Sequence, residues 1–314
     1  MLRRIFFTIY CFGVASYAIT AQEAFLKAQG YEKQGDTKRA LYWYKKSAKI
    51  EIAKKQECKI LQKKELVKYG QKKRVLLSFE PYKTNYILLG SYNSTRDADR
   101  KRYETKFQIS FKKELYSNLF GFENKLYFGY TQKSFWQTAK KSSPFRESNY
   151  APEIFLTIPY KDGSTLLKRY QIGILHESNG RDGLSSRSWN RVYLQGYYEH
   201  KGIVFIPRIW YRIPERAKKS PLDSNGDDNP DIWKYLGYGD LKIVIPYKSN
   251  LFSFRIRNNL KTKGNKGSIL FDWSFPVSKQ NIYLYLQIFS GYAESLIDYN
   301  KRNSKIGIGF SISR

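Results

Sequence analysis

The stretch from Tyr170 to Arg181 holds the residues with the clearest chemical potential. It reads YQIGILHESNGR and contains His176, one of only two histidines in the chain, two positions before Ser178. Because successive side chains of a strand point to opposite faces, His176 and Ser178 share the face of Ile174. An imidazole beside a serine hydroxyl is the pair that activates serine as a nucleophile in acyl transfer.

A third polar residue meets this pair from the next expected strand. Asn190 lies on the apolar face of that strand, together with Val192 and Leu194. If that apolar face meets lipid, polar side chains on it cost several kcal/mol of folding free energy unless they hydrogen-bond one another. Mutual hydrogen bonding therefore predicts a hydrolytic triad, in which Ser178 attacks an ester carbonyl, His176 takes its proton and Asn190 holds the imidazole tautomer. The alternation alone also allows a simple polar pair at the membrane interface.

This triad would need help from a positive charge, because an amide cannot stabilise imidazolium by charge as a carboxylate does. A calcium ion could supply that charge by polarising a water or an amide donor beside Ser178. The chain lacks the Gly-x-Ser-x-Gly turn of α/β-hydrolases, which excludes that fold. The other histidine, His200, falls at an expected turn, and we expect it to be an ordinary surface residue.

The elements that must hold these residues are strands. Apolar and polar residues alternate in stretches such as 153–158 and 281–288, with the period of a strand that has one apolar face. About twelve such segments follow one another, starting near Asn85, Tyr103, Lys125, Asn149, Lys168, Ser188, Gly202, Trp233, Asn250, Gly267, Asn281 and Asn303. An even number of antiparallel strands with aromatic ends is typical of an outer-membrane barrel. We therefore predict an all-β fold, a twelve-stranded antiparallel transmembrane β-barrel with a short N-terminal helical segment.

The first residues indicate export from the cytoplasm. Arg3 and Arg4 precede a short apolar stretch at 5–18, and small residues follow it. We therefore expect a signal peptide over residues 1–21. A membrane anchor is the alternative, but the apolar stretch is short for one.

The rest of the chain divides near residue 75. Residues 22–74 have a helical pattern that resembles one tetratricopeptide or Sel1-type repeat, and we expect a basic periplasmic appendage there. Both a solvated spacer and a partner-docking module fit this segment. Residues 75–314 are expected to form the barrel. Once the signal is removed, Cys58 is the only cysteine, which excludes an intramolecular disulfide and a zinc framework.

Composition narrows the protein class further. The 314 residues include 27 Tyr and 20 Phe, too many for a disordered basic tail. Mean hydropathy is −0.60, and outside the extreme N-terminus no run reaches the roughly 18 apolar residues of a spanning helix, which excludes a polytopic helical membrane protein. A soluble sandwich would alternate too, but the export signal and the aromatic excess favour the barrel. Short joints such as 200–202 would be periplasmic turns, and longer ones such as 214–232 extracellular loops.

Several long strings resemble the outer membrane phospholipase A family. The resemblance is carried by HESNGR at 176–181, SSRSWNR at 185–191, SSPFRE at 142–147, DDNPD at 227–231 and SGYAESLIDY at 290–299. It extends from about Tyr130 to the C-terminus and leaves out the helical segment. That family is a twelve-stranded barrel that hydrolyses acyl esters of phospholipids with calcium and is active as a dimer. The resemblance gives His176 the role of base, Ser178 that of nucleophile and Asn190 that of orienting residue.

The resemblance also implies a calcium site of hard oxygen ligands. These are the backbone carbonyl at Arg181, the hydroxyl of Ser186 and the carboxylate of Asp228. A carbonyl at Ser142 would come from the opposite subunit, so the metal site would belong to the dimer. Gln132 matches the membrane-embedded dimer contact of the family.

We therefore expect a calcium-dependent phospholipase of A1/A2 type that acts on phospholipids and lysophospholipids. It would work in the bacterial outer membrane as a reversible, calcium-linked homodimer. The alternative is a non-catalytic barrel, a porin or an adhesin, which would have no need of polar residues on the lipid face. The net charge of +29 raises the question of whether the protein binds nucleic acid. Without the signal it divides into +10 before residue 75 and +17 across the barrel, a spread that favours contact with anionic lipid, so no nucleic acid partner is expected.

Overall fold

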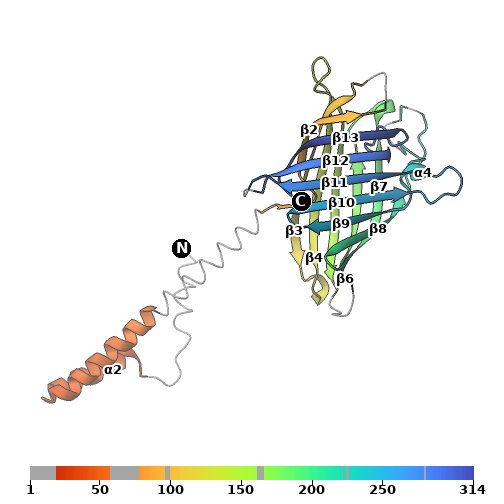
Figure 1. Ribbon diagram of the computed structural model, residues 1–314. Helices are drawn as coiled ribbons and strands as arrows, with labels where there is room; N and C mark the ends of the chain where they lie inside the picture. The colour runs from red at the N-terminus through yellow and green to blue at the C-terminus, as the bar shows by residue number, and fades with distance from the viewer. Residues whose placement is uncertain are drawn as a thin grey trace. The chain divides into compact units, whose positions relative to one another are not determined.

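The chain divides into two compact units, residues 1–78 and 79–314. The structure is a computed structural model that describes residues 19–56, 78–95, 100–160, 166–220, 222–223, 226–278 and 281–314 (Figure 1). Most of the expected signal peptide and Cys58 lie outside these residues. No helix among the described residues is long and apolar enough to cross a membrane.

The described part of the first unit contains two helices, α2 at Ala21–Lys33 and a second that covers 37–56. A capping box starts α2: the Thr20 hydroxyl accepts from the Glu23 backbone N–H, and the Glu23 carboxylate accepts from that of Thr20. The small buried residues Ala24, Ala28 and Ala40 allow close helix packing. The helical pattern therefore forms helices here, while the role of the appendage stays a prediction.

The second unit is a closed antiparallel barrel of twelve strands, β2 to β13. Each strand pairs with the next along the chain, and β13 pairs with β2 to close the ring. The strands are β2 Tyr86–Asn93, β3 Tyr103–Ser117, β4 Lys125–Trp136, β5 Phe145–Pro159, β6 Leu167–Ser178, β7 Ser188–His200, β8 Ile203–Ile213, β9 Gly239–Tyr247, β10 Asn250–Asn258, β11 Gly267–Pro276, β12 Tyr283–Tyr292 and β13 Arg302–Ser311. A two-residue strand, β1 at Glu80–Pro81, pairs with β3 beyond the end of β2. The predicted fold class is confirmed.

Two of the predicted strand starts are wrong by several residues. The segment placed at Trp233 begins with the short helix α4, Trp233–Leu236, and β9 starts only at Gly239. The aromatic residues of this segment mimic the alternation of a strand, but Leu236 packs into a buried hydrophobic cluster with Ile232 and Leu296. Strand β5 begins at Phe145 and not near Asn149, because its first polar residues face the lumen and are buried there.

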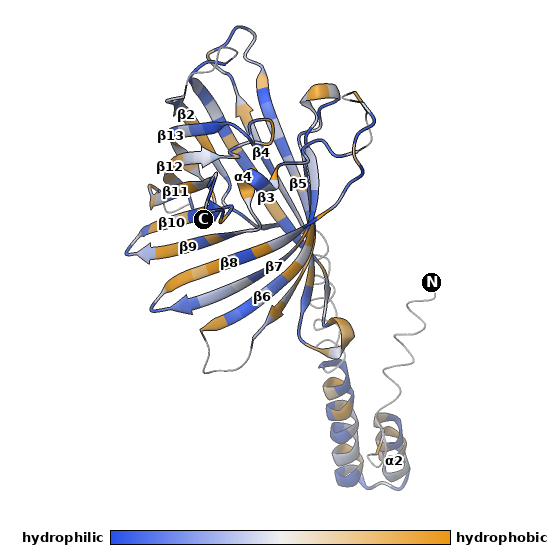
Figure 2. Ribbon diagram, turned by 90° about the vertical axis from the view of Figure 1, so that its right-hand side faces the viewer, coloured by the Kyte–Doolittle hydropathy of each residue, from blue (hydrophilic) through white to orange (hydrophobic). Residues whose placement is uncertain are grey.

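The two faces of the barrel wall differ in chemistry, as the alternating colours along the strands indicate (Figure 2). Outward side chains are apolar, for example Ile172 and Ile174, which are 47% and 58% exposed in the isolated chain. The lumen instead holds charged pairs such as Lys106–Glu294, with 3.0 Å between Nζ and Oε1. This arrangement suits a wall whose outer face meets lipid and whose interior is polar.

The long connections gather at one end of the barrel and pack on each other. Residues 293–301 turn inward: the backbone N–H of Leu296 donates to Asn149, and that of Ile297 donates to Glu147. The Tyr299 hydroxyl then donates to Asp231 Oδ1 at 2.5 Å in the neighbouring 214–238 connection. These contacts fix the 214–238 connection, which carries several of the candidate site residues.

Candidate active site

His176 and Asn190 face each other across strands β6 and β7. They are direct cross-strand partners, and the imidazole Nδ1 lies 2.9 Å from Asn190 Oδ1. Both lie on the outward face, because the alternate residues Leu175 and Arg191 are buried on the lumen side. The predicted face and the predicted pairing of these two side chains therefore agree with the geometry.

Ser178 ends β6, two residues beyond His176, and is half-buried. Its cross-strand partner is Ser188. Within the described residues no hydrogen bond joins Ser178 to His176. The bond from Nδ1 to Asn190 leaves Nε2 as the imidazole nitrogen available to a serine hydroxyl. Such nucleophile–base hydrogen bonds are often loose without substrate and tighten in the complex.

A carboxylate that the sequence analysis missed stands behind Asn190. The Asn190 Nδ2 donates to Glu215 Oε1 at 3.2 Å. Burial raises the pKa of Glu215, and the negative charge of Asp227 adds to the rise. Glu215 lies in an irregular connection 25 residues after Asn190. No alternation pattern extends into such a segment, so the sequence held no signal for it.

The lumen side of the same strand ends carries an ion pair. Glu177 and Arg191 form a salt bridge, and the Trp189 indole donates to Glu177 Oε2 at 3.2 Å. The Arg191 guanidinium also lies 3.6 Å from the centre of the Trp189 ring. These contacts immobilise the two strand ends from inside, and so hold the outward residues in place.

Two of the four candidate calcium ligands are in contact. The Ser186 hydroxyl donates to Asp228 Oδ2 at 2.7 Å, and the Ser188 hydroxyl donates to the same oxygen at 3.1 Å. The Lys218 ammonium lies 2.6 Å from the other oxygen, Oδ1. Burial by itself would raise the pKa of Asp228, but the Lys218 and Ser186 hydrogen bonds outweigh it and hold the pKa below its ordinary value.

The other two candidate ligands lie in two loops: Arg181 in the 179–187 connection, which also carries Ser186, and Ser142 in the 137–144 connection. The Arg181 guanidinium is 3.3 Å from the buried Glu147 carboxylate, which ties down the loop that would present the Arg181 carbonyl. Ser142 is exposed in the 137–144 connection, with a φ of 60°. No hydrogen bond joins Ser142 to the other three in the part of the chain that the structure describes.

The donor set at Asp228 fits a hard cation. A carboxylate, a hydroxyl and backbone carbonyls are the oxygen ligands that calcium prefers. The ammonium of Lys218 at Asp228 is a direct sign that this position binds positive charge. Among the described residues, no group of three or more His, Cys, Asp or Glu side chains could hold a metal, so a calcium site here would need hydroxyl and carbonyl oxygens beside the Asp228 carboxylate.

Gln132 lies on the outward face of β4. Its amide donates to Ser134 Oγ at 3.1 Å and accepts from the Tyr130 hydroxyl at 3.1 Å. All three side chains share one face, since Thr131 is buried on the lumen side. Side chains of the same strand therefore supply hydrogen bonds to the Gln132 amide, which suits a polar group in a membrane-embedded position.

Comparison with known proteins identifies the family of the chain. The family model for phospholipase A1 matches residues 62–312. A Neisseria meningitidis relative is 42% identical over 220 residues, which are 67% of this chain and 54% of that protein, so the chain spans about half of that relative's length. The phospholipase A1 of Escherichia coli K12 is 36% identical over 249 residues, 74% of this chain and 81% of that enzyme.

Solved structures lead to the same family. Outer membrane phospholipase A from Escherichia coli matches with a TM-score of 0.67 and 34% identity, over 75% of this chain and 91% of that one. The Salmonella typhi outer membrane phospholipase, solved as a dimer with bound calcium, matches with a TM-score of 0.67 and 34% identity, over 75% and 92%. The chain belongs to the phospholipase A1 family, as a β-barrel of the bacterial outer membrane.

Proposed function

We propose that this protein is a calcium-dependent phospholipase that hydrolyses acyl esters of phospholipids and lysophospholipids at the outer surface of its barrel. The observation that carries the proposal is the 2.9 Å contact between His176 Nδ1 and Asn190 Oδ1 on the outward face, beside the exposed apolar residues Ile174 and Val192. Ser178 follows this pair on the same face. Membership of the family supports phospholipids as the substrate class. The proposal includes attack on the ester at either acyl position of the lipid.

The chemistry follows from the three side chains. Ser178 attacks the ester carbonyl while His176 takes the proton of the serine hydroxyl. His176 then gives this proton to the leaving alcohol, and an acyl-serine remains. A water then attacks the acyl-serine, with His176 again accepting a proton and then restoring it to the serine. Asn190 accepts from the Nδ1–H, so that Nε2 faces the reaction. The Glu215 carboxylate behind the Asn190 amide would supply the negative charge that the amide lacks, and we propose it as a positioning residue.

The position of these residues matches a lipid substrate. An acyl ester in the outer leaflet lies near the boundary between hydrocarbon and headgroups, and the outward residues at the long-loop end of β6 and β7 are at a comparable position on the barrel. A lipid could therefore reach Ser178 without leaving the membrane.

Calcium would be held by the hydroxyl of Ser186, the carboxylate of Asp228 and the carbonyl of Arg181, with the carbonyl of Ser142 from a second copy. When bound, the ion would supply positive charge that stabilises the oxyanion. Lys218 occupies Asp228 Oδ1 in this structure, so calcium would have to displace an ammonium. The Salmonella typhi relative, a dimer with bound calcium, supports a calcium-linked homodimer. The family resemblance places Gln132 in the proposed dimer contact.

The same proposal extends to the organisation of the chain. Residues 1–21 would direct export, 22–74 would form the periplasmic appendage, and 75–314 would be the phospholipase barrel. Whether the appendage is a spacer or docks a partner does not affect the hydrolytic site.

The test is acyl release by the folded, detergent-solubilised protein from phospholipid–detergent micelles, with calcium and with a chelator. We expect release that depends on calcium, and products from a lipid labelled in both chains would identify the position attacked. Absence of release by a heat-modifiable, folded barrel with calcium would overturn the proposal. Ion conductance across planar bilayers without hydrolysis would favour the porin alternative.

A further inference from the structure

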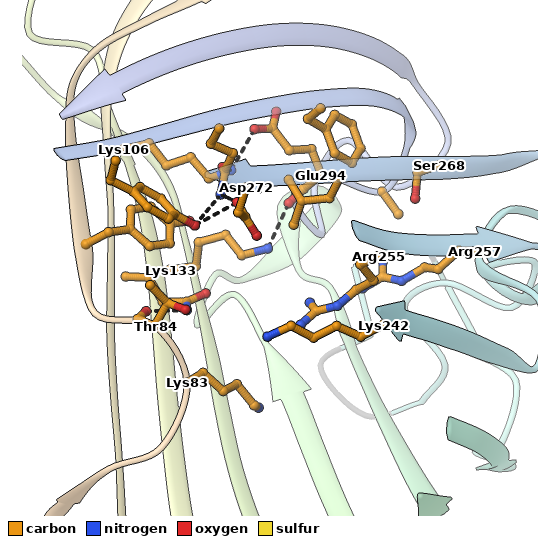
Figure 3. Close-up of a pocket in the computed structure, with 17 residues that line it drawn as sticks. Lys83, Thr84, Lys106, Lys133, Lys242, Arg255, Arg257, Ser268, Asp272 and Glu294 are labelled. Carbon is orange, nitrogen blue, oxygen red and sulfur yellow. Dashed lines mark hydrogen bonds and ion pairs between the residues drawn. The ribbon is translucent and has the colours of Figure 1, made fainter. Parts of the chain in front are cut away.

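The lumen of the barrel contains a cavity with a strong excess of positive charge. Its cationic lining residues come from four strands and the segment before β2, and its only carboxylates among the described residues are Asp272 and Glu294. The cations are Lys83, Lys106, Lys133, Lys242, Arg255 and Arg257 (Figure 3). In a region enclosed by protein, such an excess costs more than it would in water, because the charges are less screened.

Both carboxylates are already engaged. Glu294 lies within ion-pair distance of Lys106, at 3.0 Å, and of Lys305, at 2.7 Å. Asp272 accepts hydrogen bonds from three uncharged side chains: Ser253 at 3.2 Å, Tyr285 at 2.7 Å and Gln287 at 2.8 Å. Three of the six cations, Lys133, Lys242 and Arg255, have no carboxylate within ion-pair distance among the described residues.

The β9–β10 hairpin makes the imbalance clearest. At one cross-strand position Asp240 faces Arg257, and their charges compensate, with 3.7 Å between Oδ2 and Nε. Two residues further along each strand, Lys242 faces Arg255. Like charges directly opposite each other on a sheet are destabilising. The second pair therefore lacks the counter-ion that the first pair has.

Lys133 brings a third cation to the same space from β4. Its ammonium donates to a neutral acceptor, the backbone carbonyl of Glu294, at 3.1 Å. In Figure 3 the ends of Lys133, Lys242 and Arg255 point into the same part of the cavity. The free volume there is about 60 Å³, room for a few waters or one small anion.

We propose that Lys133, Lys242 and Arg255 form a binding site for a small oxyanion, of the chemical class of inorganic phosphate, inside the barrel. A guanidinium binds two oxygens of such an anion side by side, and the two ammonium groups add point charges. The anion would relieve the repulsion between Lys242 and Arg255 and join β4 to the β9–β10 hairpin across the lumen. This site is separate from the outward residues proposed for hydrolysis, so either proposal can fail without the other.

The test is calorimetric titration of the detergent-solubilised full chain with inorganic phosphate, with ionic strength held constant by chloride. We expect one phosphate per chain, and a higher unfolding temperature in phosphate than in chloride. Lys242→Gln and Arg255→Gln should each weaken phosphate binding at least tenfold. Lys248→Gln, in the exposed turn of the same hairpin, should leave it unchanged.

Equal stabilisation by phosphate and chloride, or wild-type affinity in Lys242→Gln, would overturn the proposal. If a neutral variant does not fold, Arg255→Lys keeps the charge and should bind phosphate more weakly than the wild type. Phosphorus NMR of phosphate with the wild-type chain gives a direct reading, since bound phosphate broadens the signal and an unbroadened signal would exclude the site. Competition by glycerol 3-phosphate distinguishes a site that takes phosphate esters from one confined to the free anion.

Discussion

The ends of strands β6 and β7 carry two polar pairs, one on each side of the barrel wall. On the lumen side Glu177 and Arg191 are ionised, paired and covered by Trp189. On the outward side, one residue away, His176 and Asn190 form one hydrogen bond with each other, and the Asn190 amide donates a second one to Glu215. The lumen can accommodate the charges of Glu177 and Arg191 because each is the counter-ion of the other, whereas polar groups that face hydrocarbon need hydrogen bonds with one another. We therefore expect the inner pair to serve stability and the outer pair to serve the proposed chemistry.

The largest expected effect tests the outer side. Ser178→Ala should reduce acyl release at least about 1,000-fold, because the nucleophile is lost while the barrel stays folded. Acyl release and heat-modifiable migration on gels are the measurements. Ser290→Ala, a half-buried outward serine on β12, is the matched control and should keep wild-type activity. A correctly inserted Ser178→Ala variant with normal turnover would remove Ser178 from the mechanism.

The inner pair should respond in the opposite way, through stability. Glu177→Gln leaves the Arg191 charge without its partner and should lower the free energy of unfolding by about 3 kcal/mol. Urea unfolding and refolding in lipid vesicles measures this. Glu199→Gln, an exposed glutamate on β7, should change it little. If the two variants unfold alike, the Glu177–Arg191 bridge is not what secures these strand ends.

The calcium site can be shifted in both directions. Asp228→Ala should raise the calcium concentration for half-maximal activity at least about 100-fold. The loss of a ligand should weaken calcium binding more than the loss of a residue that only orients a ligand. Lys218→Met removes the competing ammonium and should lower that concentration. Because Ser142 is proposed to come from the second copy, calcium should also promote self-association. Calcium titrations of activity and of crosslinking check both variants, and superimposable curves would mean that the metal site is elsewhere.

Asn190→Ala should be milder than loss of the nucleophile. His176 keeps its function as a base but loses one hydrogen bond that becomes charge-assisted when the imidazole is protonated. The expected cost is about 2 kcal/mol, or roughly a 30-fold lower kcat. Steady-state kinetics on micelles gives this value. An unchanged kcat would show that the contact between the two side chains is structural only.

The smallest effect concerns Glu215, which acts through Asn190. Glu215→Gln keeps the hydrogen bond but removes the charge, and should lower kcat about tenfold, or about 1.4 kcal/mol, with little change in KM. It should also move the acidic limb of the pH–rate profile to lower pH, because positive charge on the imidazole is less stabilised. Glu215→Asp should restore part of the rate. A lower rate with an unmoved pH profile would indicate a purely structural residue.

Much of this protein could be predicted from local patterns. The period of two along each strand is a property of a few neighbouring residues, and it is enough to place His176 and Ser178 on one face and Glu177 on the other. The number of strands and the apolar outer face followed in the same way, because each segment repeats the pattern independently. Where the chain leaves this pattern, as at Trp233, the prediction was wrong, since a short aromatic stretch can pack as a helical turn.

Only the tertiary structure decided which distant residues meet. Strand register brings Asn190 opposite His176 at 2.9 Å, and it also brings Lys242 opposite Arg255. Loop packing sets Glu215 behind Asn190 and Lys218 on Asp228, contacts for which neither segment carries a periodic signal. The physical reason is that side-chain direction depends on local backbone geometry, whereas pairing and loop contacts depend on the closure of the whole barrel.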